Sequence, residues 1–549
     1  MRTQFDETAK AFAAMKLASH LLEPWSLGQV FFSVAARIAL IALVMAMVGC
    51  ASLPSGVQRP VSQAASDVSQ TGLAKIAAAN TPEDKRELSG FRLLPAGDQA
   101  FNARIALARR AEKTLDVQYY LIAHDASGLQ FLRELRDAAA RGVRVRILVD
   151  DLYANGQDEL LAALAGHANI EVRMFNPLPV RNGGLASRVV LSMHQFSRIN
   201  GRMHNKLFIA DNAFSVSGGR NVADEYFGRS EPANFIDMDI LASGPVVREQ
   251  STVFDGYWNS EHTYPVQSLA APIDAEAARR LFAERVQALA KDHPVAARDP
   301  LGRTSVQAQL DSGRLEQHFA SVRVHADAPA KINGVNAQRI DGTVMSGKLD
   351  LVRSAKSDVL IASPYFIPGS HGLAAMKEAI GNDVRLTVMT NSFATTDEPL
   401  VHFGYTRYRR AMLKMGVTLY ELAPTDGRKS DAMGELHASL GRLHAKLAVV
   451  DSRFLFIGSM NMDGRSARWN TEAGLVIDSP ELAEEVSSLL KRERLPSSYK
   501  LRIAGDEERI EWVAGQDAKE VVHSDEPDAS WGQQLRLSFM SMFVEEDLL

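Results

Sequence analysis

Two segments of the chain, 202–221 and 442–461, carry the same set of side chains that could act on a phosphate. They read RMHNKLFIADNAFSVSGGRN and RLHAKLAVVDSRFLFIGSMN, so each holds His-x-Lys, an Asp five residues after the Lys, Gly-Gly or Gly-Ser, and a final Asn. His444 follows His204 by 240 positions, and the other shared residues keep the same offset. One such short motif can arise by chance, but two copies in register indicate a duplicated site.

The spacing of His204 and Lys206 suits phosphate chemistry. In an extended strand, residues i and i+2 point to the same face, so this pair projects together, and so does the pair in the second copy. If the two halves pack about a pseudo-two-fold axis, both pairs face one cleft. The lysines would offset the charge of a phosphodiester and of its transition state, and the two Asn side chains can donate to the same oxygens. The candidate catalytic residues are His204, Lys206, Asn221, His444, Lys446 and Asn461.

The elements that would position these side chains also occur twice. Residues 115–120 read as a strand, 131–139 repeat apolar side chains at helical spacing, and 143–150 read as a second strand. This order predicts a βαβ unit with a parallel pair of strands. It returns as a strand at 359–366, a helix at 373–380 and a strand at 384–390. The sequence therefore predicts an α/β protein built from two α-β-α sandwich halves, with the cleft at their interface.

Composition shifts along the chain predict its domain organisation. Residues 51–86 are rich in Ala, Ser, Gln and Pro and lack sustained periodicity, which is typical of a flexible tether. The predicted segments are a leader or anchor (1–50), the tether (51–86), the N-terminal half (87–270), a connecting segment (271–320), the C-terminal half (321–480) and a helix and hairpin extension (481–549).

The single cysteine, Cys50, excludes an internal disulfide framework. Arg37 precedes the apolar run 38–48, and Gly49 and Cys50 follow, so the segment resembles a lipoprotein signal in which Cys50 is lipidated. The alternative is a plain anchor over 29–49, which is nearly long enough to span but holds Arg37 in its middle. Both alternatives predict a protein attached to a membrane of the bacterial cell envelope. The net charge of −5 gives no general attraction to nucleic acid, so none is expected as a partner.

The doubled motif resembles the signature of the phospholipase D superfamily, and the resemblance covers about residues 90–480. Finer similarity is to the bacterial cardiolipin synthases of the C type. It lies in MHNK, in GGRN followed by DEYF, and in the segments YWNS (257–260), SPYFIPG (363–369) and TNS (390–392). This resemblance implies two phospholipase D-like halves and a transfer of a phosphatidyl group to the glycerol head of phosphatidylglycerol, which makes cardiolipin. Phosphatidylglycerol, and phosphatidylethanolamine as a second candidate, are the implied lipid substrates. We expect neither a metal nor another cofactor.

The resemblance also implies a phosphohistidine mechanism. One histidine attacks phosphorus, and the other protonates the leaving alcohol and then deprotonates the incoming one. We favour His204 as the nucleophile and His444 as the acid and base, but the repeat is nearly symmetric and the reverse stays open.

Carboxylates are expected behind the second ring nitrogen of each catalytic histidine, where they fix the tautomer. Glu472 is the candidate in the second half, and Asp237 occupies the corresponding position in the first half, with Asp239 as a rival on the same strand face. Asp211 and Asp451 belong to the motifs, but we interpret them as turn or scaffold residues, because Asp favours turns and strand ends.

Four classes of function remain after this step. Transfer between phospholipids is favoured, and hydrolysis of phospholipids with water as acceptor and a nuclease of the same superfamily are the enzymatic alternatives. A noncatalytic membrane-binding protein is the last. Four arginines could bind a second phosphate or be structural, namely Arg202, Arg220, Arg465 and Arg468. The sequence does not determine the oligomeric state.

Overall fold

The computed structural model describes residues 52–289, 293–334, 341–424, 439–505, 508–515, 520–529 and 532. Cys50 and the predicted leader lie outside these residues, as does Trp531. No helix in the described ranges is long and apolar enough to cross a membrane.

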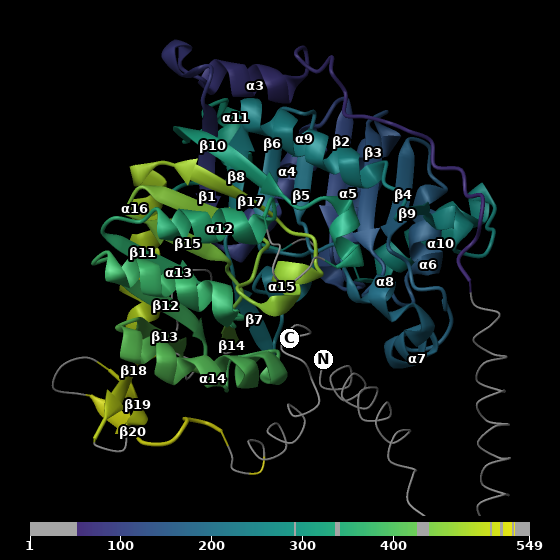
Figure 1. Ribbon diagram of the computed structural model, residues 1–549. Helices are drawn as coiled ribbons and strands as arrows, with labels where there is room; N and C mark the ends of the chain where they lie inside the picture. Colours follow the sequence, from purple (N-terminus) through teal and green to yellow (C-terminus); the bar gives the residue numbers. More distant parts are fainter. Residues whose placement is uncertain are drawn as a thin grey trace, which may run out of the picture.

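Two sheets of matching topology form the body of the protein (Figure 1). In the first half only the β2, β3 and β4 pairings are parallel, as the predicted βαβ unit requires, and the other pairings are antiparallel. Its strands, in spatial order, are β9 (Thr263–Pro265), β4 (Ile170–Phe175), β3 (Arg144–Asp150), β2 (Thr114–Tyr119), β5 (Leu207–Ala210), β6 (Phe214–Gly218), β8 (Asp239–Ser243) and β1 (Ser89–Leu94).

The second half repeats this order and extends it. Its strands are β10 (His318–Ala326), β17 (Ala473–Asp478), β16 (Phe454–Gly458), β15 (Leu447–Val450), β11 (Asp358–Ala362), β12 (Arg385–Asn391), β13 (Thr418–Leu422), β18 (Ser498–Ala504), β19 (Arg509–Ala514) and β20 (Val521–His523). The edge strands β1 and β10 pair antiparallel, with Gly90 opposite Phe319, and so join the two sheets. The matching strand orders on either side of this pair confirm the predicted two-half architecture.

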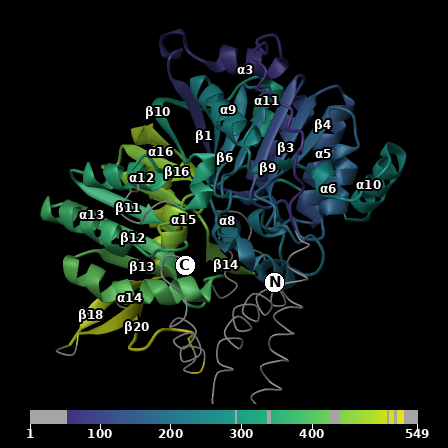
Figure 2. The ribbon, with the colours of Figure 1, turned by 45° about the vertical axis from the view of Figure 1, so that its right-hand side comes forward.

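Helices cover both faces of the sheets (Figures 1 and 2). Those of the first half are α3 (Gly72–Asn80), α4 (Gly97–Arg110), α5 (Ala126–Ala140), α6 (Asp158–Ala165), α7 (Leu185–Leu191), α8 (Phe196–Asn200), α9 (Pro245–Trp258) and α10 (Ala275–Leu289). Then follow α11 (Val306–Ser312), α12 (Val344–Arg353), α13 (Gly369–Gly381), α14 (Pro399–Met415), α15 (Gly464–Arg468) and α16 (Pro480–Leu489). Each half has its own apolar core on one face, under α4 and α5 or under α12 and α13. A third core runs through both halves and includes Phe91, Trp258, Leu475 and Leu482, so the halves form one folded unit.

Sequence and structure differ over several boundaries. Strand β11 ends at Ala362 rather than 366, because Pro364 has no N–H for the ladder. Helix α10, placed in the connecting segment 271–320, packs on α6 of the first half, and β10 begins the second half at His318. Helix α16 contributes to the shared core rather than to an extension after 480.

The predicted flexible tether at 51–86 is instead an ordered strap laid along the first half. Its backbone carbonyls accept hydrogen bonds from buried arginines: Pro60 from Arg173 at 2.5 Å, and Ser62 from Arg146 at 3.0 Å. The Ser62 hydroxyl also accepts from the indole N–H of Trp258 at 2.9 Å. Polar contacts hold the part of the strap before α3, which is why its composition resembles that of a tether, and Leu73 of α3 is buried in the core of the first half.

Candidate active site

The two motif histidines lie immediately before matching strands and are held by the opposite half of the molecule. Strand β5 begins at Leu207 and β15 at Leu447, so His204 and His444 sit in the short segments that lead into them. The His204 amide donates to the Thr471 carbonyl at 2.9 Å, and the His444 amide donates to the Ile236 carbonyl at 2.8 Å. The backbone of each motif is therefore fixed by a residue of the other half.

The carboxylates cross the interface in the same way. His204 Nδ1 lies 3.0 Å from both carboxylate oxygens of Glu472, and His444 Nδ1 lies 2.6 Å from an oxygen of Asp237. Each candidate carboxylate thus contacts the imidazole of the opposite half. The sequence analysis had instead assigned each carboxylate to the histidine of its own half. Glu472 and Asp237 are fully buried. Since each carboxylate engages Nδ1, Nε2 is the ring nitrogen left for chemistry on both histidines.

Burial dominates the protonation of these rings. It lowers the pKa of His204 to about 4 and that of His444 to about 3, although the facing carboxylate acts in the opposite direction in each case. Each ring also experiences the lysine of the other motif, because Lys446 lowers the pKa of His204 and Lys206 lowers that of His444. The four basic groups therefore share one electrostatic environment, as a common phosphate site requires.

The two lysines are buried beside their histidines. Lys206 donates to the His204 carbonyl at 2.7 Å, and Lys446 donates to the His444 carbonyl at 2.5 Å while lying 3.0 Å from His444 Nδ1. Burial lowers the pKa of Lys206 to about 7 and that of Lys446 to about 8. An ammonium group has three N–H donors, so each lysine keeps capacity for a phosphate oxygen.

The two motif asparagines are both buried near this site. Asn221 donates to the Tyr226 hydroxyl at 2.9 Å, and the side-chain oxygens of Asn221 and Asn461 have no partner within the described ranges. Their predicted role as donors to a phosphate stays a prediction.

Aromatic rings form walls beside both histidines. Tyr120 packs edge-on against His204 at 5.1 Å between ring centroids, and Tyr226 does the same against His444 at 5.1 Å. Phe235 lies 4.7 Å from the His444 ring. These rings restrict the imidazole orientations and keep the surroundings apolar, which explains the low pKa values.

Glu472 is held by groups that lie outside the motif pattern used above. The Ser459 and Ser466 hydroxyls donate to its carboxylate at 2.5 Å and 2.9 Å. Its backbone N–H donates to Asp327 at 2.9 Å, and Lys331 donates to the same Asp327 oxygen at 2.6 Å. At the 240-residue offset Ser466 corresponds to Tyr226, so the two halves differ at this position. Neither Asp327 nor Lys331 has a sequence signal.

Asp237 has a simpler environment. Its Oδ1 accepts from the Met238 N–H at 2.7 Å, and contacts with His444 and Lys446 lower its pKa to about 2 against the effect of burial. The rival Asp239 instead accepts from Arg104 at 2.9 Å and so faces away from the imidazoles. A Cβ atom on Gly219 would lie 2.1 Å from Asp237 Oδ1, which explains why glycine stands where the second motif has Ser459.

The remaining motif residues have structural contacts. The Asp211 carboxylate accepts from the backbone N–H groups of residues 112–114, and Asp451 accepts equivalently from 356–358. Arg202 pairs with buried Asp150 at 2.6 Å, and Arg220 donates to the Leu94 and Pro95 carbonyls. The side chains of these two arginines therefore stabilise the fold.

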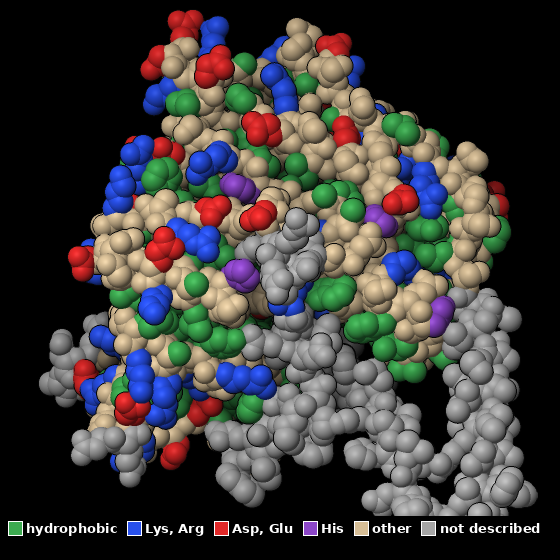
Figure 3. All heavy atoms as spheres, in the orientation of Figure 1, with side chains coloured by type: hydrophobic (Ala, Val, Ile, Leu, Met, Phe, Trp, Pro, Cys, Tyr) green, Lys and Arg blue, Asp and Glu red, His purple; other side chains and the backbone are tan. Residues whose placement is uncertain are grey.

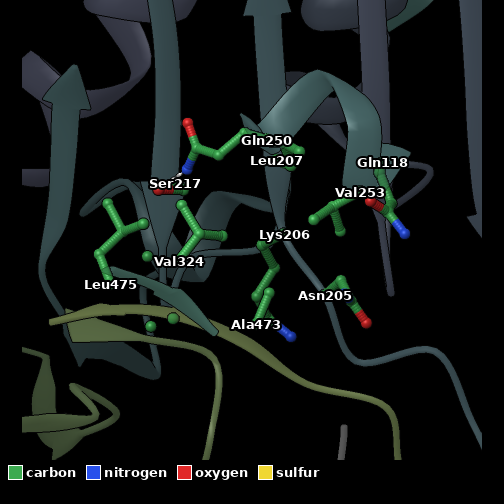
Figure 4. A pocket seen from close by; sticks show the side chains of 13 residues that line it. Gln118, Asn205, Lys206, Leu207, Ser217, Gln250, Val253, Val324, Ala473 and Leu475 are labelled. Atoms are coloured by element: carbon green, nitrogen blue, oxygen red, sulfur yellow. Dashed lines mark hydrogen bonds between the residues drawn. The ribbon is translucent and has the colours of Figure 1, made fainter. Parts of the chain in front are cut away.

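A small cavity lies behind Lys206, between the halves (Figure 4). Gln118, Asn205 and Ser217 from the first half and Ala473 and Leu475 from the second line it. It has room for about one water molecule, so it cannot hold a phospholipid.

Gly219→Ala should displace the Asp237 carboxylate, because the added methyl group occupies its position. We expect phosphodiester turnover to fall about 10–100-fold, as when a partner that orients a catalytic histidine is lost. Steady-state kinetics measures this, and Gly256→Ala in α9, where a Cβ meets nothing within 4 Å, is the matched control. Equal activity in both variants would contradict the positioning of Asp237 by Gly219.

Anion binding should weaken as pH rises through about 7 to 8. Lys206 and Lys446 have folded pKa values of about 7 and about 8, so they are cationic below this window and lose their charge above it. Isothermal titration with sulfate, which does not titrate there, should give falling affinity and proton uptake on binding. An affinity that does not change from about pH 6 to about pH 9 would contradict the lowered lysine pKa values.

The two parts of the chain that hold the motifs are similar to known proteins. A family model described as "Cardiolipin synthase, PLD-like domain" matches residues 105–258 and 349–494, which hold both motifs. "Cardiolipin synthase C" of Escherichia coli (strain K12) is 36% identical over 459 residues, covering 82% of this chain and 94% of that protein. "Cardiolipin synthase A" of Pseudomonas fluorescens (strain Pf-5) is 26% identical over 403 residues, covering 73% of this chain and 67% of that protein.

A solved structure shares the fold. The phosphatidylserine synthase of Haemophilus influenzae Rd KW20 superposes with a TM-score of 0.52 at 14% identity, covering 86% of this chain and all of that one. Together with the family match over more than half of the chain, these findings show that the chain belongs to the cardiolipin synthase, PLD-like domain family and is an enzyme of the phospholipase D superfamily.

Proposed function

We propose that the chain is a phosphatidyltransferase that makes cardiolipin from phosphatidylglycerol through a phosphohistidine intermediate. The observation that carries this proposal is the pair of buried imidazoles, each oriented by a carboxylate from the opposite half, beside two buried lysines. Such a site can bind one phosphodiester and supply both a nucleophile and an acid. The similarity to "Cardiolipin synthase C" supports a lipid alcohol as the acceptor.

The reaction has two displacements at phosphorus. In the first, Nε2 of one histidine forms a P–N bond, the P–O bond to the head-group alcohol breaks, and the other histidine gives that oxygen its proton. In the second, a glycerol hydroxyl of phosphatidylglycerol attacks, the P–N bond breaks, and the second histidine takes the hydroxyl proton. Lys206 and Lys446 stabilise the extra negative charge on the phosphoryl oxygens in both steps.

Differences between the two carboxylates support His204 as the nucleophile. Two serine hydroxyls donate to the Glu472 carboxylate and disperse the negative charge that faces His204, whereas a single backbone N–H donates to the Asp237 carboxylate that faces His444. Lys446 lowers the pKa of His444, but the charge of a phosphodiester offsets that ammonium group. Asp237 then stabilises an imidazolium at His444, which suits the acid.

The test is to incubate the purified full chain with labelled phosphatidylglycerol vesicles, with and without phosphatidylethanolamine. We expect labelled cardiolipin, and we expect His204→Ala and His444→Ala to lower its formation by at least about 1,000-fold. His167→Gln, a histidine outside the site, is the control and should keep full activity. Phosphatidic acid as the only product would overturn transfer in favour of hydrolysis, and cleavage of an oligonucleotide instead of lipid would indicate a nuclease.

The assignment of the nucleophile predicts a covalent species. With a p-nitrophenyl phosphatidyl ester, whose leaving group needs no acid, His444→Ala should release one equivalent of nitrophenol rapidly and retain the phosphatidyl group on the chain. His204→Ala should show neither burst nor label, since its nucleophile is missing. The label should map to His204 in a rapid denaturing quench, and a label on His444 would reverse the roles.

A further inference from the structure

The segment between β4 and β5 exposes apolar side chains at the surface. It contains α7, the short helical turn Met193–Gln195 and α8, and it projects at the lower right of Figure 1. Val190 and Phe196 are 43% and 37% exposed, which makes them two of the five large apolar residues that the described chain exposes. Hydrophobic side chains gather over this area in Figure 3. We call residues 185–200 the apolar knob.

The knob lies in a part of the sequence that has no acidic residues. Between Glu171 and Asp211 the chain holds no Asp or Glu, although the whole sequence has 66 of them. Arg198 at the knob donates to the neutral oxygens of Gln195, Asn176 and Pro177, so no carboxylate in direct contact cancels its charge. The arginines Arg181 and Arg188 are paired with Asp151 and Asp158, so Arg198 is the charge that suits the apolar tip to an anionic lipid surface.

Ion pairs and amide contacts hold the knob rigidly at its base. Buried Arg188 pairs with buried Asp151 at 2.8 Å, and Asn176 donates to the carbonyls of Arg198 and Gly201 at 2.7 Å. The exposed Val190 and Phe196 therefore stand on a fixed platform, and their exposure does not come from a loosely attached loop.

The same platform is coupled to the active site. Arg465 of the second half donates to the carbonyl of Asn200 at 2.8 Å and to its side-chain oxygen at 3.0 Å. Arg465 precedes Ser466, whose hydroxyl holds Glu472, and Asn200 ends α8 four residues before His204. When the knob binds a surface, these contacts fix the position of His204 relative to that surface.

We infer that the apolar knob inserts into the surface of an anionic phospholipid bilayer and presents the active site to the lipids there. This inference rests on the proposed function, because a phospholipid substrate is drawn from such a surface. Burial of Val190, Phe196 and their apolar neighbours supplies the hydrophobic part of the binding, and Arg198, which donates only to neutral oxygens, favours an anionic head-group layer.

Insertion of the knob can be measured by fluorescence at position 196. Phe196→Trp in the full chain should gain fluorescence that brominated phosphatidylglycerol vesicles quench, measured as the difference from the parent chain. Val522→Trp is the matched control, because Val522 is 44% exposed but lies in the C-terminal hairpin. Less quenching with phosphatidylcholine vesicles would support the charge argument. Quenching of Phe196→Trp no stronger than that of the control would overturn the inference, and would leave a second copy or another segment of this chain to cover the knob.

A second measurement connects the knob to catalysis. The double variant Val190→Asp, Phe196→Asp should lower the ratio of turnover on phosphatidylglycerol vesicles to turnover on dispersed short-chain phosphatidylglycerol by about tenfold or more. Val521→Asp, Val522→Asp is the control and should keep the parent ratio. An unchanged ratio in the knob variant would overturn the inference. Absence of any turnover in the parent chain would refute the proposed function instead, and the quenching experiment would still test insertion.

Discussion

The structure depends on two buried contacts that cross between its halves, His204 with Glu472 and His444 with Asp237. A carboxylate buried without a partner would be strongly unfavourable, so each half needs the imidazole that the other supplies. The halves must therefore fold as one unit. The antiparallel pairing of β1 with β10 and the apolar core that runs through both halves provide the free energy that holds these charges together.

The repeat has near two-fold symmetry in its backbone but not in the chemistry around its histidines. Gly219 corresponds to Ser459 and Tyr226 to Ser466 at the 240-residue offset, so hydroxyl donors reach Glu472 and none of these reaches Asp237. A symmetric site would give two histidines of equal basicity. A displacement with a nucleophile and an acid needs unequal ones, and in this repeat the residues behind the carboxylates differ while both histidines and both lysines are kept.

Much of this arrangement could be predicted from sequence, because it is local. The identical spacing of the motifs indicated two matching segments, and the sequence pattern predicted β2 and β3 within one residue, although α5 begins at Ala126, five residues before the predicted start. The crossing of Glu472 and Asp237 could not be predicted, because spacing along one chain does not say which half faces which. Asp327 and Lys331 had no signal for the same reason: Asp327 accepts from the backbone N–H of Glu472, which is 145 residues away, and Lys331 acts through Asp327.

The strap shows the same limit and adds a constraint on the whole molecule. Its composition suggested a tether, but Arg146 and Arg173 are buried in β3 and β4 with N–H groups to satisfy, and the strap carbonyls accept them. Arg59 is fixed as well, since its side chain donates to the Thr263 carbonyl at 2.5 Å. Arg59 lies nine positions after Cys50, a distance of at most about 30 Å when the chain is fully extended.

A lipid attachment at Cys50, as the sequence predicts, would consequently hold the first half close to the bilayer, because only a short segment joins them. The strap descends towards the level of α8 in Figures 1 and 2, so this attachment and the apolar knob would act at the same end of the molecule. Two contacts with one surface restrict rotation where one does not. Because α8 ends at Asn200, four residues before His204, this restriction would extend to the two histidines, which would then meet phospholipid head groups in a narrow range of orientations.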